Sequence, residues 1–131
     1  MNHSPRVVNS SPRVVHHSEY LALSLLLVGA AVWQRDHITG WFWFWLLAPD
    51  LFGYVPAFFF GRPPAKGYLP PRGVWLYNLW HNFTLPLALG AALLLLLAAD
   101  PWPLLGWLLH ISVDRLIGYG LRGEDGGQAL I

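Results

Sequence analysis

Four ionisable residues interrupt apolar stretches that are long enough to be membrane helices: Asp50, His81, His110 and Asp114. A charge in the hydrocarbon core costs about 2.5–3.5 kcal/mol on insertion scales, so such residues usually serve a function. His110 and Asp114 are four residues apart and therefore share one face of a helix. Imidazole nitrogens and carboxylate oxygens together are typical ligands of divalent metals such as Zn or Mn. We therefore predict that these four residues bind one divalent metal.

The same residues are suited to hydrolysis. A bound metal activates water, and a carboxylate such as that of Asp114 accepts the proton. Without a metal, His110 or His81 acts as the general base. His110 and Asp114 are therefore the predicted catalytic residues. A purely structural interpretation stands beside this one: Asp114 then orients His110 within a buried hydrogen-bonded network that has no chemical role.

Three more polar residues lie within one helical turn of the predicted ligands. Tyr77 and Asn78 precede His81, and Arg115 follows Asp114 directly. We predict that they surround the ligands and that hydrogen bonds from this group hold an imidazole in one tautomer. For Asn78 the alternative is an ordinary polar contact between helices. Arg115 either extends to the membrane interface or faces the site, where it can hold a phosphate.

Membrane helices must position these residues, because the composition is that of a membrane protein. The chain has 131 residues, of which 55% are hydrophobic and 11% charged, whereas soluble domains carry about 25% charged residues. Four apolar segments, each near the roughly 20 residues that span a bilayer, cover residues 20–34, 38–60, 74–99 and 102–121. Polar or Pro-rich turns separate them. We therefore predict an all-α fold, a four-transmembrane-helix bundle made of two antiparallel hairpins.

The predicted membrane domain occupies residues 19–123, with a short tail at either end. Residues 1–18 contain two copies of the sequence Ser-Pro-Arg-Val-Val and are predicted to be a disordered polar tail. Residues 124–131 are predicted to be a second short tail. We expect the repeat to have no function.

The distribution of positive charge predicts the orientation of the bundle. With four spans, the two termini and the loop at residues 61–73 share one side, where six Lys or Arg residues occur, against Arg35 alone on the other. Because positive loops stay in the cytoplasm, both termini are predicted to be cytoplasmic, in a multi-pass protein of the inner (plasma) membrane. At about 1.5 Å per residue, the predicted ligands lie roughly 10–17 Å from the cytoplasmic boundary. Three helices thus bring their polar residues to one depth.

Composition also limits the partners and cofactors. The net charge is +1 and the basic residues are scattered, so we expect no nucleic acid. The chain has no cysteine, which excludes a disulfide, a thiolate zinc site, an iron–sulfur cluster and covalently attached haem. The expected partners are the lipid bilayer and either further copies of the chain, in a homo-oligomer, or the subunits of a larger membrane complex.

Three strings resemble those of a small bacterial integral-membrane family, DUF4260 (domain of unknown function). They are residues 47–51, 76–81 and 110–120. The resemblance implies a four-helix membrane protein and no particular activity. More distantly, the chain resembles the membrane-bound metal-dependent hydrolases. The resemblance rests on the order of Pro49-Asp50, then His81 in the next segment, then a His-x-x-x-Asp motif at residues 110–114. That family has an arginine and a second histidine after the first histidine, and this chain lacks both.

Two functions of different classes follow. The first is a metal-dependent hydrolase that acts on a lipid or a phosphoester at a polar intramembrane site. The alternative is a non-catalytic accessory subunit of a larger membrane complex, in which a histidine at membrane depth ligates a pigment or haem. A third interpretation, a pathway for protons or small solutes, predicts an internal repeat between the hairpins. The sequence has none beyond the shared layout of two spans.

Overall fold

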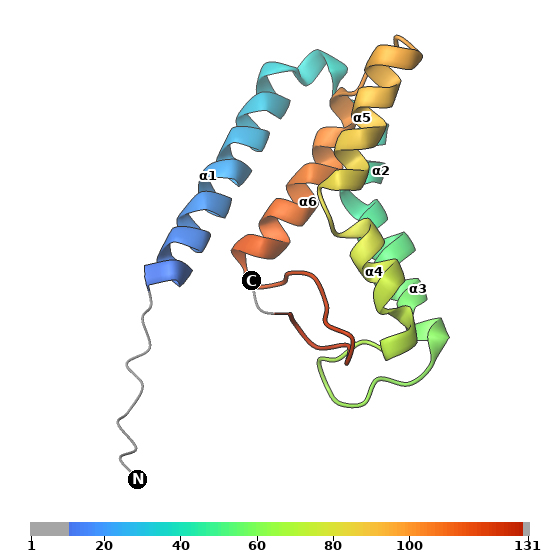
Figure 1. The fold of residues 1–131 in the computed structure, drawn as a ribbon. Coiled ribbons are helices and arrows are strands. Elements are labelled where there is room, and N and C mark those ends of the chain that lie inside the picture. The colour runs from blue at the N-terminus through green and yellow to red at the C-terminus, as the bar shows by residue number, and fades with distance from the viewer. Residues whose placement is uncertain (1–10, 130–131) are drawn as a thin grey trace.

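All regular structure in the described part of the chain is helical. The computed structural model describes residues 11–129, and within them there is no β-strand, only an isolated antiparallel bridge between Arg122 and Gln128. The α-helices are α1 (Ser11–Trp33), α2 (Gly40–Pro49), α3 (Val55–Ala57), α4 (Val74–Trp80), α5 (Thr84–Leu96) and α6 (Leu105–Leu116). The predicted all-α class is therefore confirmed (Figure 1).

Three stretches of helix are long and apolar enough to cross a membrane, which indicates a membrane protein. They are Pro12–Trp33, Gly40–Phe60 and Pro71–Leu96. The fourth predicted span corresponds to α6, which has 12 residues. Such a helix is about 18 Å long, shorter than the roughly 30 Å of hydrocarbon in a bilayer. The four-span bundle and the cytoplasmic termini stay predictions.

Helix α6 lies at the centre of the molecule, because both α1 and α2 pack along it (Figure 1). Its buried residues extend from Leu105 to Ser112. The indole of Trp107, 1% exposed, stacks on Trp45 of α2 and Trp80 of α4, with ring centroids 5.3 and 4.9 Å away. Because other helices cover α6, its own apolar length need not match the thickness of a bilayer.

Helix α1 begins earlier than the sequence indicated. It starts at Ser11, so residues 11–18 of the predicted disordered tail form its first turns, whereas residues 1–10 lie outside the described part. Pro12 suits this start, because the first N–H groups of a helix have no partner within it. Further along, the hydroxyl of Ser24 lies 2.7 Å from that of Ser112 on α6. Small side chains at such a contact let two helices approach closely.

The second and third apolar segments are not continuous α-helices. Directly after Pro49, the residues Asp50–Tyr54 form a π-helix, η2. Between α4 and α5 the chain bends at residues 81–83. Interruptions of this kind recur at functional sites. Inside a membrane, protein must cover the backbone groups that they free. Asp50 begins the first interruption and His81 begins the second.

The residues after α6 fold back against the loop before α4 (Figure 1). The Leu69 N–H donates to the carbonyl oxygen of Gly126 at 2.9 Å, and Arg122 pairs with Gln128 in the antiparallel bridge. Gly126 has φ of +89°, and a Cβ atom there would collide with the backbone of Leu69, so the close approach needs glycine. Residues 124–129 of the predicted tail therefore belong to the folded part of the molecule.

Gly106→Ala is expected to destabilise the protein, because the added methyl group would overlap the carbonyl oxygen of Phe42 and lie 3.0 Å from the amide nitrogen of Leu46. These are backbone atoms of α2, and overpacking of this kind costs about 1–3 kcal/mol. Gly29→Ala is the matched control, since nothing lies within 4 Å of its Cβ position. Thermal unfolding in detergent, followed by circular dichroism, should show a lower Tm for Gly106→Ala alone. Equal Tm values for both variants would contradict the close contact between α2 and α6.

Candidate metal centre

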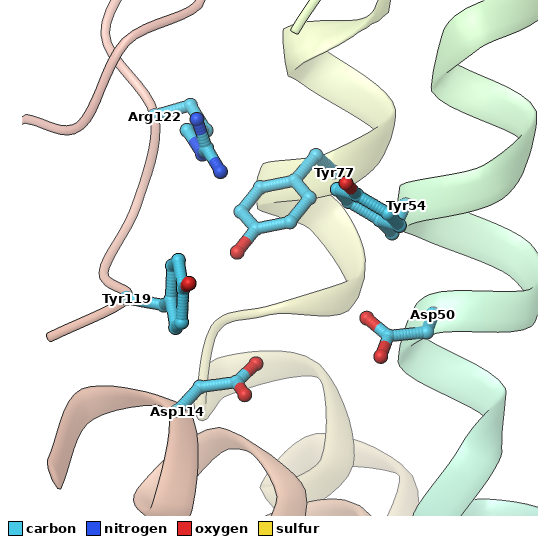
Figure 2. Close-up of a pocket in the computed structure, with 6 residues that line it drawn as sticks. All are labelled: Asp50, Tyr54, Tyr77, Asp114, Tyr119 and Arg122. Carbon is cyan, nitrogen blue, oxygen red and sulfur yellow. The ribbon is translucent and has the colours of Figure 1, made fainter. Parts of the chain in front are cut away.

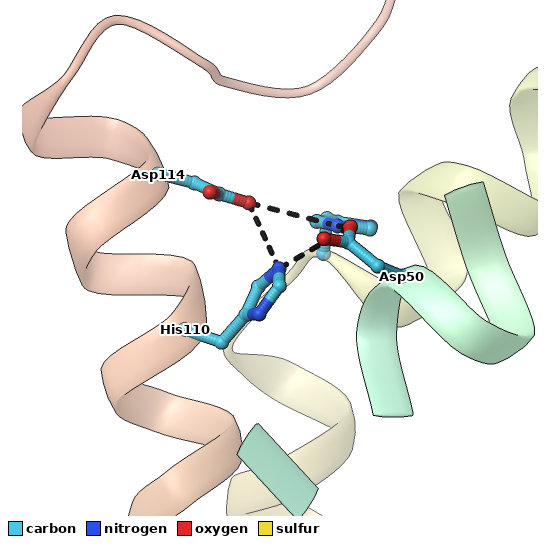
Figure 3. A group of neighbouring side chains, drawn as sticks. Asp50, His110 and Asp114 are labelled. Atoms are coloured by element: carbon cyan, nitrogen blue, oxygen red, sulfur yellow. Dashed lines mark hydrogen bonds and ion pairs between the residues drawn. The ribbon is translucent and has the colours of Figure 1, made fainter. Parts of the chain in front are cut away.

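The four predicted ligands lie together at the level of the two helix interruptions. One nitrogen or oxygen atom from each of them lies within 4.8 Å of the other three. Nε2 of His81 is 3.2 Å from Asp50 Oδ1 and 3.6 Å from Asp114 Oδ2. Nε2 of His110 is 3.4 and 3.1 Å from the same two oxygens. Figure 3 shows Asp50 on η2 and the pair on α6 pointing toward one another.

The helix interruption at Pro49 changes the backbone hydrogen bond of Asp50 and leaves a carbonyl group that His110 binds. The Asp50 N–H donates to the carbonyl oxygen of Leu47, three residues back, whereas in an α-helix it would bind that of Leu46. The Leu46 oxygen accepts a hydrogen bond from Nδ1 of His110 at 2.7 Å. Because an unpaired carbonyl is costly within a membrane, this bond both satisfies α2 and orients the imidazole.

His81 is oriented in the same way at the end of α4. Its Nδ1 donates to the carbonyl oxygen of Tyr77 at 2.8 Å, and its ring stacks on the ring of Tyr77 with centroids 3.8 Å apart. The His81 side chain is 3% exposed, so packing restrains it on all sides. A histidine that is held by one nitrogen presents the other in a defined direction, here toward Asp50 and Asp114.

These hydrogen bonds determine which nitrogen of each imidazole carries a proton. A carbonyl oxygen only accepts, so Nδ1 of His81 and of His110 must carry a hydrogen. In the neutral rings Nε2 then holds a lone pair that points toward carboxylate oxygens. Nε2 of His110 is buried and has no hydrogen-bond partner among residues 11–129. The arrangement needs either a proton on each Nε2 or a cation between the four atoms.

The nitrogen–oxygen distances of the cluster match those between neighbouring ligand atoms of one metal ion, and all four atoms lie within 4.8 Å of one another. Zinc lies about 2.0–2.2 Å from histidine nitrogens and carboxylate oxygens, so the ligand atoms around it are roughly 3.3–3.6 Å apart. The four nitrogen–oxygen distances in this cluster run from 3.1 to 3.6 Å. Two carboxylates and two neutral imidazoles carry two negative charges, which a divalent cation neutralises. The donor set therefore fits Zn, or another divalent ion such as Mn.

The predicted neighbours of the ligands occupy different positions. Tyr77 contacts His81 through both its ring and its carbonyl oxygen. The side-chain amide of Asn78 exchanges two hydrogen bonds with the backbone of Arg122, at 2.8 and 3.0 Å. Arg115 turns toward α1 and donates to the carbonyl oxygen of His81 at 3.4 Å. Tyr77 therefore orients a ligand, whereas Asn78 holds the segment that follows α6.

Two residues outside the predicted site support the bend after α4. The side chain of Asn82 accepts from the Leu85 N–H at 3.0 Å and donates to the carbonyl oxygen of Asn78 at 2.7 Å. Nε1 of Trp107 donates to the carbonyl oxygen of Trp80 at 2.9 Å. An asparagine just before a helix is a usual capping signal. Nothing in the sequence distinguishes Trp107 from the tryptophans that lie at a membrane interface.

A cavity of about 170 Å³ adjoins the cluster on the carboxylate side. Asp50 and Asp114 line one wall, and Tyr77, Tyr119 and Arg122 line much of the rest (Figure 2). Asp50 is the most exposed of the four ligands, with 53% of its side chain accessible. The cluster is therefore covered at the histidines and open at the carboxylates.

Trp107→Phe is expected to destabilise the protein, because the carbonyl oxygen of Trp80 loses the indole N–H that binds it at 2.9 Å. A buried acceptor left without a partner costs about 1–3 kcal/mol. Trp33→Phe makes the same chemical change at a side chain that is 78% exposed, where we expect little effect. Thermal unfolding of both variants in detergent measures the difference. A Tm for Trp107→Phe as high as that of Trp33→Phe would show that this bond does not support the bend.

Comparison with known proteins places the chain in a family. No curated protein and no solved structure matches it. The more distant resemblance to membrane-bound metal-dependent hydrolases has no support in these comparisons and stays a prediction. The family model described as Domain of unknown function (DUF4260) matches residues 13–129, which include all four residues of the cluster. The first of the two predicted resemblances is thereby confirmed, and the chain belongs to the DUF4260 family.

Proposed function

We propose that this DUF4260 protein is a membrane-embedded metalloenzyme that hydrolyses a phosphoester or a lipid. Asp50, His81, His110 and Asp114 hold one divalent metal, Zn or Mn, and the reaction takes place in the adjoining cavity. The observation that carries the proposal is the buried Nε2 of His110, which faces two carboxylate oxygens and has no hydrogen-bond partner among the described residues. A metal ion between the four atoms is the partner that this lone pair fits.

The direction of this nitrogen favours a metal over a proton. A proton on Nε2 of His110 would need an oxygen along the N–H direction. The oxygens of Asp50 and Asp114 lie 3.4 and 3.1 Å away, and neither is aligned for a hydrogen bond. Nε2 of His110 therefore lies close to both oxygens without a hydrogen bond to either of them. A cation at the centre of the cluster contacts all four donor atoms.

The reaction divides between the metal and the chain. The metal, when bound, acts as a Lewis acid that polarises the substrate and activates water. Asp50 Oδ1 and Asp114 Oδ2 face the metal position, and the second oxygen of either carboxylate accepts the proton of the attacking water. The water oxygen forms a bond to phosphorus as the bond from phosphorus to the leaving oxygen breaks. The protonated carboxyl group then returns its proton to the leaving oxygen.

The position of the opening supports a substrate that arrives from the cytoplasmic side. Tyr119 and Arg122 of the segment after α6 line the cavity. This segment lies at the same end of the molecule as the start of α1 and the loop at residues 61–73 (Figure 1). The positive charges of the loops are concentrated at that end, which predicts the cytoplasmic side. A phospholipid headgroup or a soluble phosphoester reaches the cavity from there.

The purified protein is expected to contain about one divalent metal ion per chain, as a single four-ligand site requires. His110→Ala and Asp114→Ala should each remove most of it, because even an indirect contact to a metal ligand contributes about tenfold or more to affinity. Inductively coupled plasma mass spectrometry of protein purified in detergent measures the content. Wild-type protein that binds neither Zn nor Mn after reconstitution would overturn the metal centre.

The matched control is a second histidine and aspartate pair. Nδ1 of His37 and Oδ2 of Asp100 lie 2.8 Å apart, and both side chains are exposed. His37→Ala and Asp100→Ala remove the same residue types from a place where the described residues form no group of three or more metal-ligating side chains. Their metal content should equal that of the wild type, and a matching loss would show that the method does not distinguish the two pairs.

Hydrolysis should require both the metal and Asp50. Asp50→Asn keeps the size of the side chain but removes its charge and its capacity to accept a proton, so kcat should fall by about a hundredfold or more. Phosphatidic acid in mixed micelles and the soluble ester p-nitrophenyl phosphate are the substrates to assay, with Asp100→Asn as control. Bound metal without turnover of either substrate would contradict an enzyme. That result would favour the alternative of a non-catalytic accessory subunit.

A further inference from the structure

An arginine forms the wall of the cavity that faces the carboxylates. Arg122 follows α6 and is 8% exposed. Its backbone is held by Asn78, which accepts from the Arg122 N–H at 2.8 Å and donates to the Arg122 carbonyl oxygen at 3.0 Å. The guanidinium lines the cavity across from Asp50 and Asp114 (Figure 2). A permanent positive charge therefore lies opposite the proposed metal position.

The protein does not saturate this guanidinium. Among residues 11–129, both hydrogen bonds of the group leave Nη1, toward the carbonyl oxygens of Gly67 at 2.8 Å and Gly126 at 3.2 Å. Nε is buried and has no hydrogen-bond partner in the same part of the chain. Arginine has five N–H donors in a rigid fork, and a buried donor without a partner is costly. The donors left over indicate an anionic ligand.

Tyr77 adds a hydroxyl group to the same cavity. Its ring stacks on His81, and Cζ of Arg122 lies 5.3 Å from the centroid of the ring. Figure 2 shows the hydroxyl directed into the cavity, in the space between Tyr119 and Asp114. Because neighbours hold the ring, the hydroxyl group is oriented before a ligand arrives.

We infer that this cavity binds the phosphate group of the substrate, with Arg122 and Tyr77 as its anchors. The inference rests on the proposed function, because the metal neutralises the two carboxylates of the other wall. Asp50, Asp114, a divalent metal and Arg122 together carry a charge of about +1, which attracts a phosphate. Without the metal the same groups carry about −1, which repels it.

The volume limits how much of a substrate enters. The cavity measures about 170 Å³, below the roughly 300–1,000 Å³ of pockets that enclose a whole drug-sized ligand. A phosphate and the first atoms of its ester therefore enter, and the rest of the molecule stays outside. A lipid headgroup and a small soluble phosphoester both present such a group.

Arg122 also links two loops through its hydrogen bonds to Gly67 and Gly126. If that were its whole role, a variant of Arg122 that still folds would bind phosphate as tightly as the wild type. The test therefore measures binding of inorganic phosphate to the full chain in detergent by isothermal titration calorimetry, with Zn content verified by mass spectrometry. The variants are Arg122→Gln and Tyr77→Phe. Arg72→Gln is the matched control, because Arg72 is an exposed arginine of the 3-10 turn η4 (Pro71–Gly73).

Arg122→Gln should weaken phosphate binding by about tenfold or more, because it removes a charge-assisted hydrogen bond. Tyr77→Phe should weaken it by a smaller factor, and Arg72→Gln should leave it unchanged. Tyr77→Phe keeps the ring that packs on His81, so it tests the subsite even where Arg122→Gln does not fold. Unchanged affinity in both variants, with one metal per chain, would overturn the subsite and leave the metal centre standing.

A double variant that should bind phosphate without a metal separates the test of the phosphate subsite from the test of the metal centre. The double variant Asp50→Asn/Asp114→Asn removes both negative charges, so Arg122 should bind phosphate there without a metal. Loss of that binding on addition of Arg122→Gln supports the subsite even where the wild type holds no metal. Phosphate binding that is independent of Arg122 in this background and in the metal-loaded protein overturns the subsite.

Competition identifies the source of the phosphate group. Phenyl phosphate represents soluble esters, and mixed micelles of phosphatidic acid represent lipid headgroups. Each competitor is titrated into wild-type protein that holds inorganic phosphate, and the competitor concentration needed for displacement is compared, counted as phosphate groups. If the micelles displace phosphate at the lower concentration, the natural ligand is a lipid headgroup. If phenyl phosphate does so, the natural ligand is a soluble ester. Displacement by neither would overturn a site for phosphate esters.

Discussion

The hydrocarbon core of a membrane contains no water, so each backbone group that a helix interruption frees must find its partner within the protein. In this chain side chains provide the partners of two such carbonyl groups. His110 donates to the carbonyl oxygen of Leu46 beside the π-helix, and Trp107 donates to the carbonyl oxygen of Trp80 at the bend. Both donors come from α6, the helix that the others cover. One carbonyl group in each of the second and third segments is therefore bound by the same central helix that carries half of the candidate ligands.

This requirement also sets the electrostatics of the cluster. Because Nδ1 of His81 and of His110 donates to a carbonyl oxygen, the neutral rings direct a second lone pair at Asp50 and Asp114. Four acceptor atoms within 4.8 Å repel one another unless a proton or a metal ion lies between them. A bundle selected for stability alone would have little reason to keep such a group. Its location beside a cavity agrees with a role in binding a cation.

The cost of charge in apolar segments was enough to predict which residues converge. Asp50, His81, His110 and Asp114 are brought to one point, as counting residues along helices indicated. Pro86 indicates an interruption of the third segment near His81, because proline has no N–H to donate within a helix. The exact place of the bend, at residues 81–83, was not predictable because that tripeptide contains neither glycine nor proline. The short α6 was missed because hydropathy does not distinguish burial among helices from contact with lipid. Arg122 was missed because it follows the last apolar segment, and only the return of the chain against residues 61–73 brings it to the cavity.

The cluster is unevenly covered, and this unevenness bears on what kind of metal site it is suited to form. His81 and His110 are 3% and 11% exposed, whereas Asp114 and Asp50 are 23% and 53% exposed. Structural zinc sites are closed on all sides, and catalytic sites leave one side to water and substrate. The open side here is that of the carboxylates, where the cavity lies and where Arg122 faces them. The histidines are covered because they satisfy the interrupted helices. Among the described residues, the constraint that orients the ligands therefore also leaves their carboxylate side open to the cavity, where an anionic group can approach them.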